Sequence, residues 1–163
     1  MNIRVANRDE WRKVRDLYLS LLKSDPQAFA DEYDEIANHS DLEWTAGINN
    51  EDGRVFIAEE GGKMVGMGRV NFYKEAPGVS VLHKLGVLPE YRNKGMAKKL
   101  VEVREEWAKS KGSNKARLYV IANRDKVIEF SMKNGYKIIE TLPNNVQRKD
   151  GTLVDVLVME KDL

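Results

Sequence analysis

The 163-residue sequence contains no cysteine, which excludes disulfide bonds, thiolate metal sites and a nucleophilic cysteine. It contains only two histidines, His39 and His83, and these lie too far apart to show the short-range spacing of histidine metal ligands. No stretch approaches the roughly 18 consecutive apolar residues of a membrane-spanning helix, and the N-terminal residues lack the apolar run of a signal peptide. These absences predict a cytoplasmic protein with no membrane partner and no metal centre.

The chain also lacks a large net charge, because its 27 basic and 26 acidic residues give a net charge of +1. The charges are nevertheless unevenly spread. Residues 25–60 contain eleven acidic residues against one arginine, and residues 92–117 contain nine basic against three acidic residues. Each block is either a solvated face or part of a molecule with one anion-binding and one cation-attracting side. A nucleic-acid-binding protein favours a broader basic surplus, so no nucleic-acid partner is expected.

Hydrophobic and charged residues make up 42% and 33% of the chain, as in an ordinary globular domain. A chain of this mass buries roughly 70% of its unfolded surface, so residues 1–163 are expected to form one domain around one core.

Hydrophobic periodicity predicts seven strands and several helices. The predicted strands cover residues 3–5, 55–58, 64–73, 80–87, 118–122, 136–140 and 153–159. The predicted helices cover about 8–23, 96–110 and 126–133, and the polar stretch 27–50 is expected to be a loop with one or two short helices. Helices between the later strands imply a parallel crossover. The predicted fold class is therefore α/β, or α+β in some classifications: a mixed, mostly antiparallel twisted sheet of six to seven strands flanked by about four helices.

The most informative segment is the passage from a strand to a helix over residues 82–97. Small residues at Gly95 and Ala97 let a ligand approach the backbone, and unpaired N–H groups at a helix N-terminus bind phosphate or pyrophosphate. Three basic side chains add positive charge: Arg92, Lys94 and Lys98. The sequence lacks a G-x-x-x-x-G-K-[ST] loop and a G-x-S-x-G elbow, and the glycines at 66 and 68 do not complete a dinucleotide-binding motif.

This segment resembles the acetyl-CoA site of the GNAT superfamily of N-acetyltransferases. In that family a strand ends in valine, a proline follows two residues later, and Arg/Gln-x-x-Gly-x-Gly/Ala comes next; here these are Val87, Pro89 and residues 92–97. Downstream, Asn123 after a strand and Asn134-Gly135-Tyr136 after a helix are similar to later family motifs. The order of elements agrees over essentially the whole chain, so the resemblance implies a single acetyl-CoA-dependent domain without a metal cofactor.

The resemblance also implies which residues bind the cofactor. Backbone amides of one loop would cradle the pyrophosphate of CoA; they belong to Arg92, Asn93, Lys94, Gly95, Met96, Ala97 and Lys98. Leu85 and Val87 would pair their backbone with the pantetheine arm, as an added strand does. Asn123 would contact the cofactor from the neighbouring strand. The side chains of Lys94 and Lys98 either meet the 3′-phosphate or simply solubilise the surface.

The reaction that the family implies is direct attack of a primary amine on the thioester, which needs an oxyanion donor and a proton acceptor. The amide of Val87 is the expected donor. His83 is either the base or a structural histidine, and strand alternation predicts that residues 83, 85 and 87 share a face. A carboxylate of the acidic segment, such as Asp31 or Glu43, is an alternative base.

Many relatives protonate the departing thiolate with a tyrosine, and the corresponding position here is Ser131. Ser131 either relays a proton through water or is an ordinary helix-surface residue, and Tyr119 and Tyr136 are possible substitutes. A thiol with a pKa near ~8.5 is a fair leaving group without full protonation. The missing tyrosine keeps a second function open, that of an acyl-CoA-binding sensor with little turnover.

The acidic segment 25–60 corresponds to the acceptor side of the family's site. Its charge would favour a cationic amine such as a polyamine, an aminoglycoside-like molecule or a lysine or peptide amine, unless the segment is only a solvated face. The candidate acceptor-binding aromatics are Phe29, Tyr33 and Trp44, of which at least one is expected in the core. A homodimer is possible, because dimers are frequent in the family.

Overall fold

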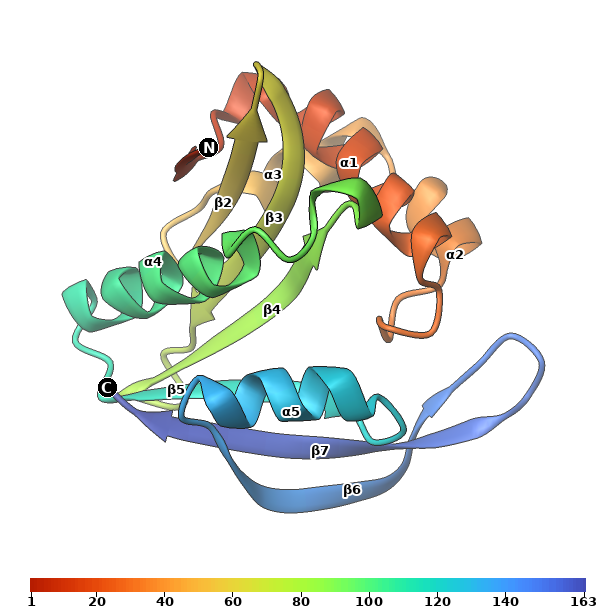
Figure 1. Ribbon diagram of the computed structural model, residues 1–163, viewed down its shortest axis with the longest axis vertical. Helices are drawn as coiled ribbons and strands as arrows, with labels where there is room; N and C mark the ends of the chain where they lie inside the picture. The colour runs from red at the N-terminus through yellow and green to blue at the C-terminus, as the bar shows by residue number, and fades with distance from the viewer.

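The computed structural model describes residues 1–163 and contains one seven-stranded sheet with helices on both faces (Figure 1). The strands are β1 (Asn2–Val5), β2 (Gly53–Glu60), β3 (Lys63–Phe72), β4 (Val79–Val87), β5 (Lys115–Ile121), β6 (Lys137–Gln147) and β7 (Leu153–Asp162). Their order in the sheet is β1-β2-β3-β4-β5-β7-β6, and only β4 and β5 pair in parallel. The expected mixed, mostly antiparallel sheet is confirmed.

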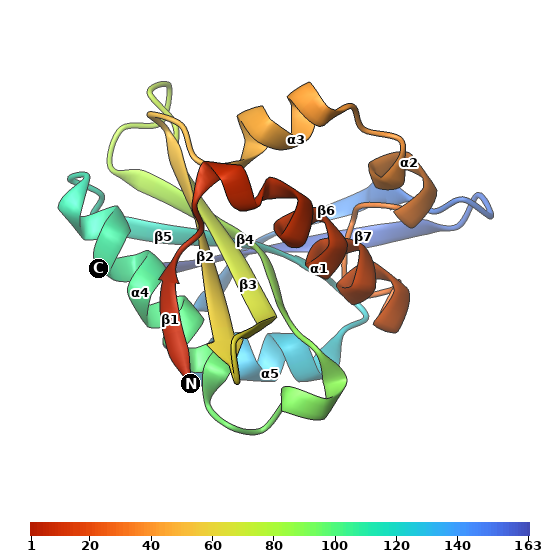
Figure 2. The same ribbon diagram turned by 90° about the horizontal axis from the view of Figure 1, so that it is seen from above.

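Five helices flank the sheet, where about four were expected. They are α1 (Trp11–Ser24), α2 (Tyr33–Ala37), α3 (Asp41–Ile48), α4 (Met96–Ser110) and α5 (Asp125–Lys133). Seen from above, α1 and α3 lie on one side of the sheet and α4 and α5 on the other (Figure 2). The polar stretch between α1 and β2 holds two short helices, where one or two were expected. No helix combines the length and the apolar character needed to cross a bilayer.

The core is divided by the sheet into two layers because side chains alternate along each strand. On β2, Ile57 packs against α1 and α3, whereas its neighbours Phe56 and Ala58 pack against α4. Helix α1 contributes buried residues at helical spacing: Val14, Leu17, Tyr18, Leu21 and Leu22. Helix α4 does the same with Leu100 and Val101, so each helix buries one apolar stripe.

Strand β6 is much longer than the predicted strand over residues 136–140. It is an edge strand that is exposed along most of its length, and its pairing with β7 shifts register between Ile138 and Glu140 and again between Leu142 and Val146. Because these shifts break the alternation of buried and exposed residues, the sequence pattern does not indicate its full length.

A β-bulge interrupts the pairing of β3 with β4. Arg69 pairs with His83, but two residues earlier on β3 the partner is Gly86, three residues further along β4. The extra residue lies at positions 84–85, and Lys84 adopts a φ of 55°. Bulges bend a strand and redirect its side chains.

The bulge moves His83 to the opposite face from the one that alternation predicted. His83 now shares a face with Gly86, where an added Cβ would lie 2.8 Å from Leu21 of α1. Val87 belongs to the core layer on the α4 side. The prediction that residues 83, 85 and 87 share a face is therefore wrong, because one residue is inserted between 83 and 87.

Strands β4 and β5 pair only at their beginnings. Val79–Val81 pair with Lys115–Arg117, and the strands diverge beyond these residues (Figure 1). The second halves of two neighbouring strands are therefore left without each other as hydrogen-bond partners, in the middle of the sheet.

Candidate active site

A cavity of about 320 Å³ occupies the space where β4 and β5 diverge. Strand β4 contributes residues 82–85 to its wall, β5 residues 118–121, the segment between α1 and α2 residues 28–31, and β6 residues 145–146. Helices α4 and α5 contribute further apolar residues. Because its walls come from both sides of the sheet, the cavity reaches both core layers.

The loop between β4 and α4 presents a row of free backbone donors. None of the six successive N–H groups from Asn93 to Lys98 donates a hydrogen bond within the protein. Gly95 has a φ of 79°, and a Cβ there would meet nothing within 4 Å. Six free donors at the positive end of a 15-residue helix are suited to binding an anion.

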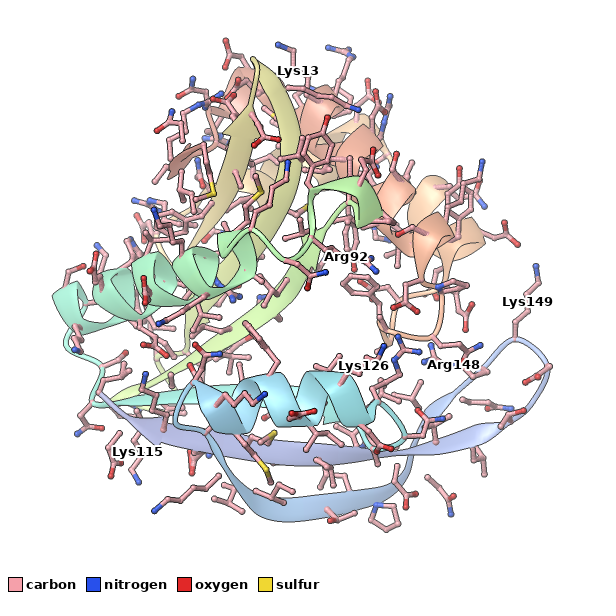
Figure 3. All side chains as sticks on the ribbon, viewed as in Figure 1. Lys13, Arg92, Lys115, Lys126, Arg148 and Lys149 are labelled. Atoms are coloured by element: carbon pink, nitrogen blue, oxygen red, sulfur yellow. The ribbon has the colours of Figure 1, made fainter.

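Arg92 stands outside this row. Its amide donates to the carbonyl of Pro89 at 3.2 Å, and its side-chain Nε donates to the carbonyl of Val87 at 2.9 Å. The expectation that the Arg92 amide takes part in the cradle is therefore wrong. Its guanidinium instead ties the loop to the end of β4, on the side of the opening between β4 and α5 (Figure 3).

The amide of Val87 points toward the opening between the strands. The next residue, Leu88, donates to the carbonyl of Val65 at 2.9 Å. Because hydrogen-bonding direction alternates along an antiparallel pair, the N–H of Val87 faces away from β3, toward the side that β5 has left. Leu85 lies in the cavity wall itself. This edge of β4 can accept an extended ligand.

His83 lies in the cavity wall with its ring held by neighbours. Its Nε2 is 2.7 Å from Oδ1 of Asn71, which also accepts from Nε of Arg69 at 2.8 Å, so we assign the ring proton to Nε2 and the lone pair to Nδ1. Burial, assisted by the charges of Lys84, Arg69 and Arg104, lowers the pKa of His83 to about 3. At neutral pH His83 is uncharged and a weak proton acceptor.

Ser131 lies in the cavity wall rather than on the surface of α5, since it is only 4% exposed. Its hydroxyl donates to the carbonyl of Val127 at 2.8 Å. Tyr136 is buried and donates to Oε1 of Glu105 at 2.8 Å, whereas Tyr119 lies in the wall and is half-exposed. The hydroxyl protons of Ser131 and Tyr136 are therefore both engaged within the protein.

The first part of the acidic segment crosses the mouth of the cavity and is neutralised there. Its ion pairs are Asp25–Arg124, Asp31–Lys84, Glu32–Arg148 and Asp34–Lys149. Arg148, on the hairpin of β6 and β7, also donates to the carbonyls of Gln27 at 3.0 Å and Phe29 at 2.5 Å (Figure 3). Four of the eleven acidic residues that were expected to attract a cationic acceptor are thus paired with the protein's own cations.

Only some of the residues that were predicted to bind the acceptor or the cofactor lie in the wall of the cavity. Phe29 lines the cavity, but Tyr33 and Trp44 do not; both pack in the core layer around α1. Asn123 is exposed on the turn after β5 and is not part of the wall, whereas its neighbour Arg124 is. Tyr33 and Trp44 therefore do not line the cavity as expected, because both pack around α1, whereas the contact of Asn123 with the cofactor stays a prediction.

Several wall residues were missed by the sequence analysis. Tyr18, whose hydroxyl donates to Oδ2 of Asp31 at 2.5 Å, follows the apolar spacing of α1 and therefore looks like a core residue. Arg104 occupies a buried position of α4. The sequence does offer a signal for it, because a charged residue stands among the apolar residues of that helix face. Lys84 owes its position to the bulge, which the sequence does not indicate.

Comparison with known proteins agrees with this geometry. The model of the acetyltransferase (GNAT) family matches residues 11–136. A GNAT-family acetyltransferase from Streptococcus pneumoniae is 18% identical, with 99% of both chains covered and a TM-score of 0.81. A ribosomal-protein-alanine N-acetyltransferase from Brucella melitensis is 21% identical over 100% of both chains, with a TM-score of 0.82.

A third structure, from Salmonella typhimurium, is described as an acetyltransferase with its cofactor acetyl-CoA. It is 18% identical, covers 100% of this chain and 94% of its own, and has a TM-score of 0.78. At these identities the likeness to solved structures shows a common fold, and the family match covers most of the chain. This chain therefore belongs to the GNAT family of acetyltransferases, which transfer an acetyl group from acetyl-CoA.

Proposed function

We propose that the protein transfers the acetyl group of acetyl-CoA to a primary amine by direct attack in a ternary complex. The observation that carries this proposal is the row of free N–H groups from Asn93 to Lys98 beside an apolar cavity. The row suits the pyrophosphate of CoA. The cavity suits the thioester end of the pantetheine arm, which would run between the diverging strands.

In this proposal the pantetheine arm lies along the open edge of β4, beside Leu85. The N–H of Val87 donates to the thioester oxygen and stabilises the oxyanion of the tetrahedral intermediate. Lys94 and Lys98 pair with surface carboxylates at 3.1 and 3.9 Å. Such exposed pairs contribute little, so either lysine can exchange its partner for the 3′-phosphate.

Proximity supplies most of the catalysis, because the ternary complex makes the attack effectively intramolecular. An alkylamine with a pKa near ~10.4 arrives protonated and must lose a proton. We assign this proton to water at the cavity mouth beside Asp31, the one carboxylate in the wall. His83 is too weak a base and the Ser131 hydroxyl is engaged, so we give both a positioning role.

A thiol-release assay across amines, amino acids, peptides and aminoglycosides tests the proposal. Free CoA thiol should appear only when an acceptor is present, and it should not appear with Gly95→Arg, whose side chain would occupy the pyrophosphate site. The engaged hydroxyl of Ser131 favours one alternative, an acyl-CoA sensor. A protein that binds acetyl-CoA but releases no thiol with any acceptor would be that sensor.

A further inference from the structure

The wall of the cavity holds more positive charge than the protein balances. It contains the cations Lys84, Arg104 and Arg124 but only one carboxylate, Asp31. Arg124 is balanced from outside the wall by Asp25 at 2.5 Å. Arg104 is 1% exposed, and its hydrogen bonds go to backbone carbonyls, with no carboxylate within 4.0 Å. Since buried charges in proteins are normally paired, this surplus indicates that an anionic group of a ligand enters the cavity.

Lys84 is the cation that can meet such a group. Its ammonium lies 3.7 Å from Oδ2 of Asp31, beyond hydrogen-bond distance, and 4.7 Å from the ring centroid of Tyr18. Its backbone has a φ of 55°, a conformation that glycine, asparagine or aspartate adopts more readily than lysine. A lysine here is therefore not explained by backbone preference. Its side chain offers three donors to the cavity.

Asp31 offers the complementary charge next to this ammonium. Its Oδ2 accepts the hydroxyl of Tyr18 at 2.5 Å, while its Oδ1 accepts no hydrogen bond in the protein. Lys84 and Asp31 thus form a loose ion pair, in which the ammonium donates no hydrogen bond and Oδ1 of the carboxylate accepts none. An α-amino acid carries its ammonium and its carboxylate on one carbon atom, so both of its charges can pair with these two residues at once.

We propose that the acceptor is a free α-amino acid with an apolar side chain, whose carboxylate is bound by Lys84 and whose amine lies at Asp31. This inference deepens the proposed function and rests on it. The apolar part of the wall receives the side chain; it includes Phe29, Ile121, Val146 and Val156. A polyamine would instead bring further positive charge beside the cations of the wall, which like-charge repulsion disfavours.

Acceptors that differ from one another in a single functional group test the inference. The thiol-release assay would compare L-leucine, L-methionine and L-phenylalanine with their amides and with the corresponding amines that lack the carboxyl group. Spermidine serves as the cationic acceptor. We expect kcat/KM for at least one amino acid to exceed that for its amide by about 10- to 100-fold, the value of one charge-assisted hydrogen bond.

Two variants of Lys84 separate its charge from its backbone. Lys84→Met keeps an unbranched stem and places the same strain on the backbone but removes the ammonium. It should lower the preference for the amino acid over its amide by about 10- to 100-fold, and Lys84→Arg should largely retain that preference. Calorimetric binding of acetyl-CoA confirms that each variant is folded.

The possible outcomes distinguish this inference from the proposed function. Equal rates for amino acids and their amides, a preference for spermidine, or an unchanged preference in Lys84→Met would overturn the inference and leave amine acetylation standing. Absence of thiol release with every acceptor would overturn both. A carboxylate preference that disappears in Lys84→Met supports the inference.

Discussion

A single methyl group at Gly68 of β3 should reveal how the bulge of β4 is held. In Gly68→Ala the added Cβ would lie 2.9 Å from Cζ and Nε of Arg104 and 3.1 Å from its Cδ. The guanidinium cannot yield cheaply, because it donates to the carbonyls of Leu100, Arg69 and His83 at 2.8, 3.2 and 3.2 Å. Two of these carbonyls belong to Arg69 and His83, which form the pair of β3 and β4 next to the bulge.

Overpacking a filled core costs about 1–3 kcal/mol, so the free energy of unfolding should fall by that amount. For a chain of this length each kcal/mol lowers the Tm by about 2–4 °C, which calorimetry or circular dichroism detects. Gly47→Ala in α3 is the matched control, because its Cβ meets nothing within 4 Å. Alanine replaces glycine in a helix there, and this variant should gain about 0.5–1 kcal/mol.

The variant Arg104→Met tests whether the contact between the added methyl group and Arg104 causes the loss of stability. When the guanidinium is absent, the cost of Gly68→Ala should shrink, and the double-mutant cycle should show a clear coupling energy. A drop in Tm that is just as large in the Arg104→Met background as in the wild type would refute the reasoning that glycine is required for the approach of Arg104.

Two further predictions concern His83 and the segment across the cavity mouth. Because burial lowers the pKa of His83 to about 3, below ~6.5 in the unfolded chain, the unfolded state binds a proton first as the pH falls. The stability that neutral His83 contributes is therefore present above about pH 6.5 and is lost toward pH 3. Urea unfolding should show that His83→Gln loses about 1–2 kcal/mol less than the wild type between pH 7 and pH 5, and an equal loss would count against the buried neutral ring. Arg148→Ala removes the hydrogen bonds to Gln27 and Phe29 and should raise the KM of the acceptor roughly tenfold while leaving the affinity for acetyl-CoA unchanged. An unchanged acceptor KM would show that Arg148 does not hold this segment in place.

Local patterns were sufficient to predict most of the fold. The apolar spacing of α1 and α4 arises because each helix buries one face in a single core layer, and the apolar run of β2 arises because its side chains enter both layers. Two features were beyond the reach of such patterns. The length of β6 is hidden by its exposure and register shifts, and the bulge at Lys84 lies beside two carbonyls that accept hydrogen bonds from Arg104, which belongs to another element.

The site was predictable only where it is contiguous in the chain. The donor row from Asn93 to Lys98 follows from one short segment, because its chemistry is that of the backbone. The cavity wall combines residues from distant elements, and a residue such as Tyr18 looks like core in its own helix. The charge balance of the acidic segment was hidden for the same reason: counting charge along residues 25–60 does not include the partners that Arg124 and Arg148 provide for Asp25 and Glu32.

Calorimetric titration of acetyl-CoA into the wild type and Gly95→Arg tests the central claim most directly. The claim is that the backbone donors from Asn93 to Lys98 bind the pyrophosphate. The wild type should bind, whereas the arginine side chain should fill the anion site and abolish measurable binding, with the variant still folded by circular dichroism. Equal affinity in the two proteins would contradict the claim.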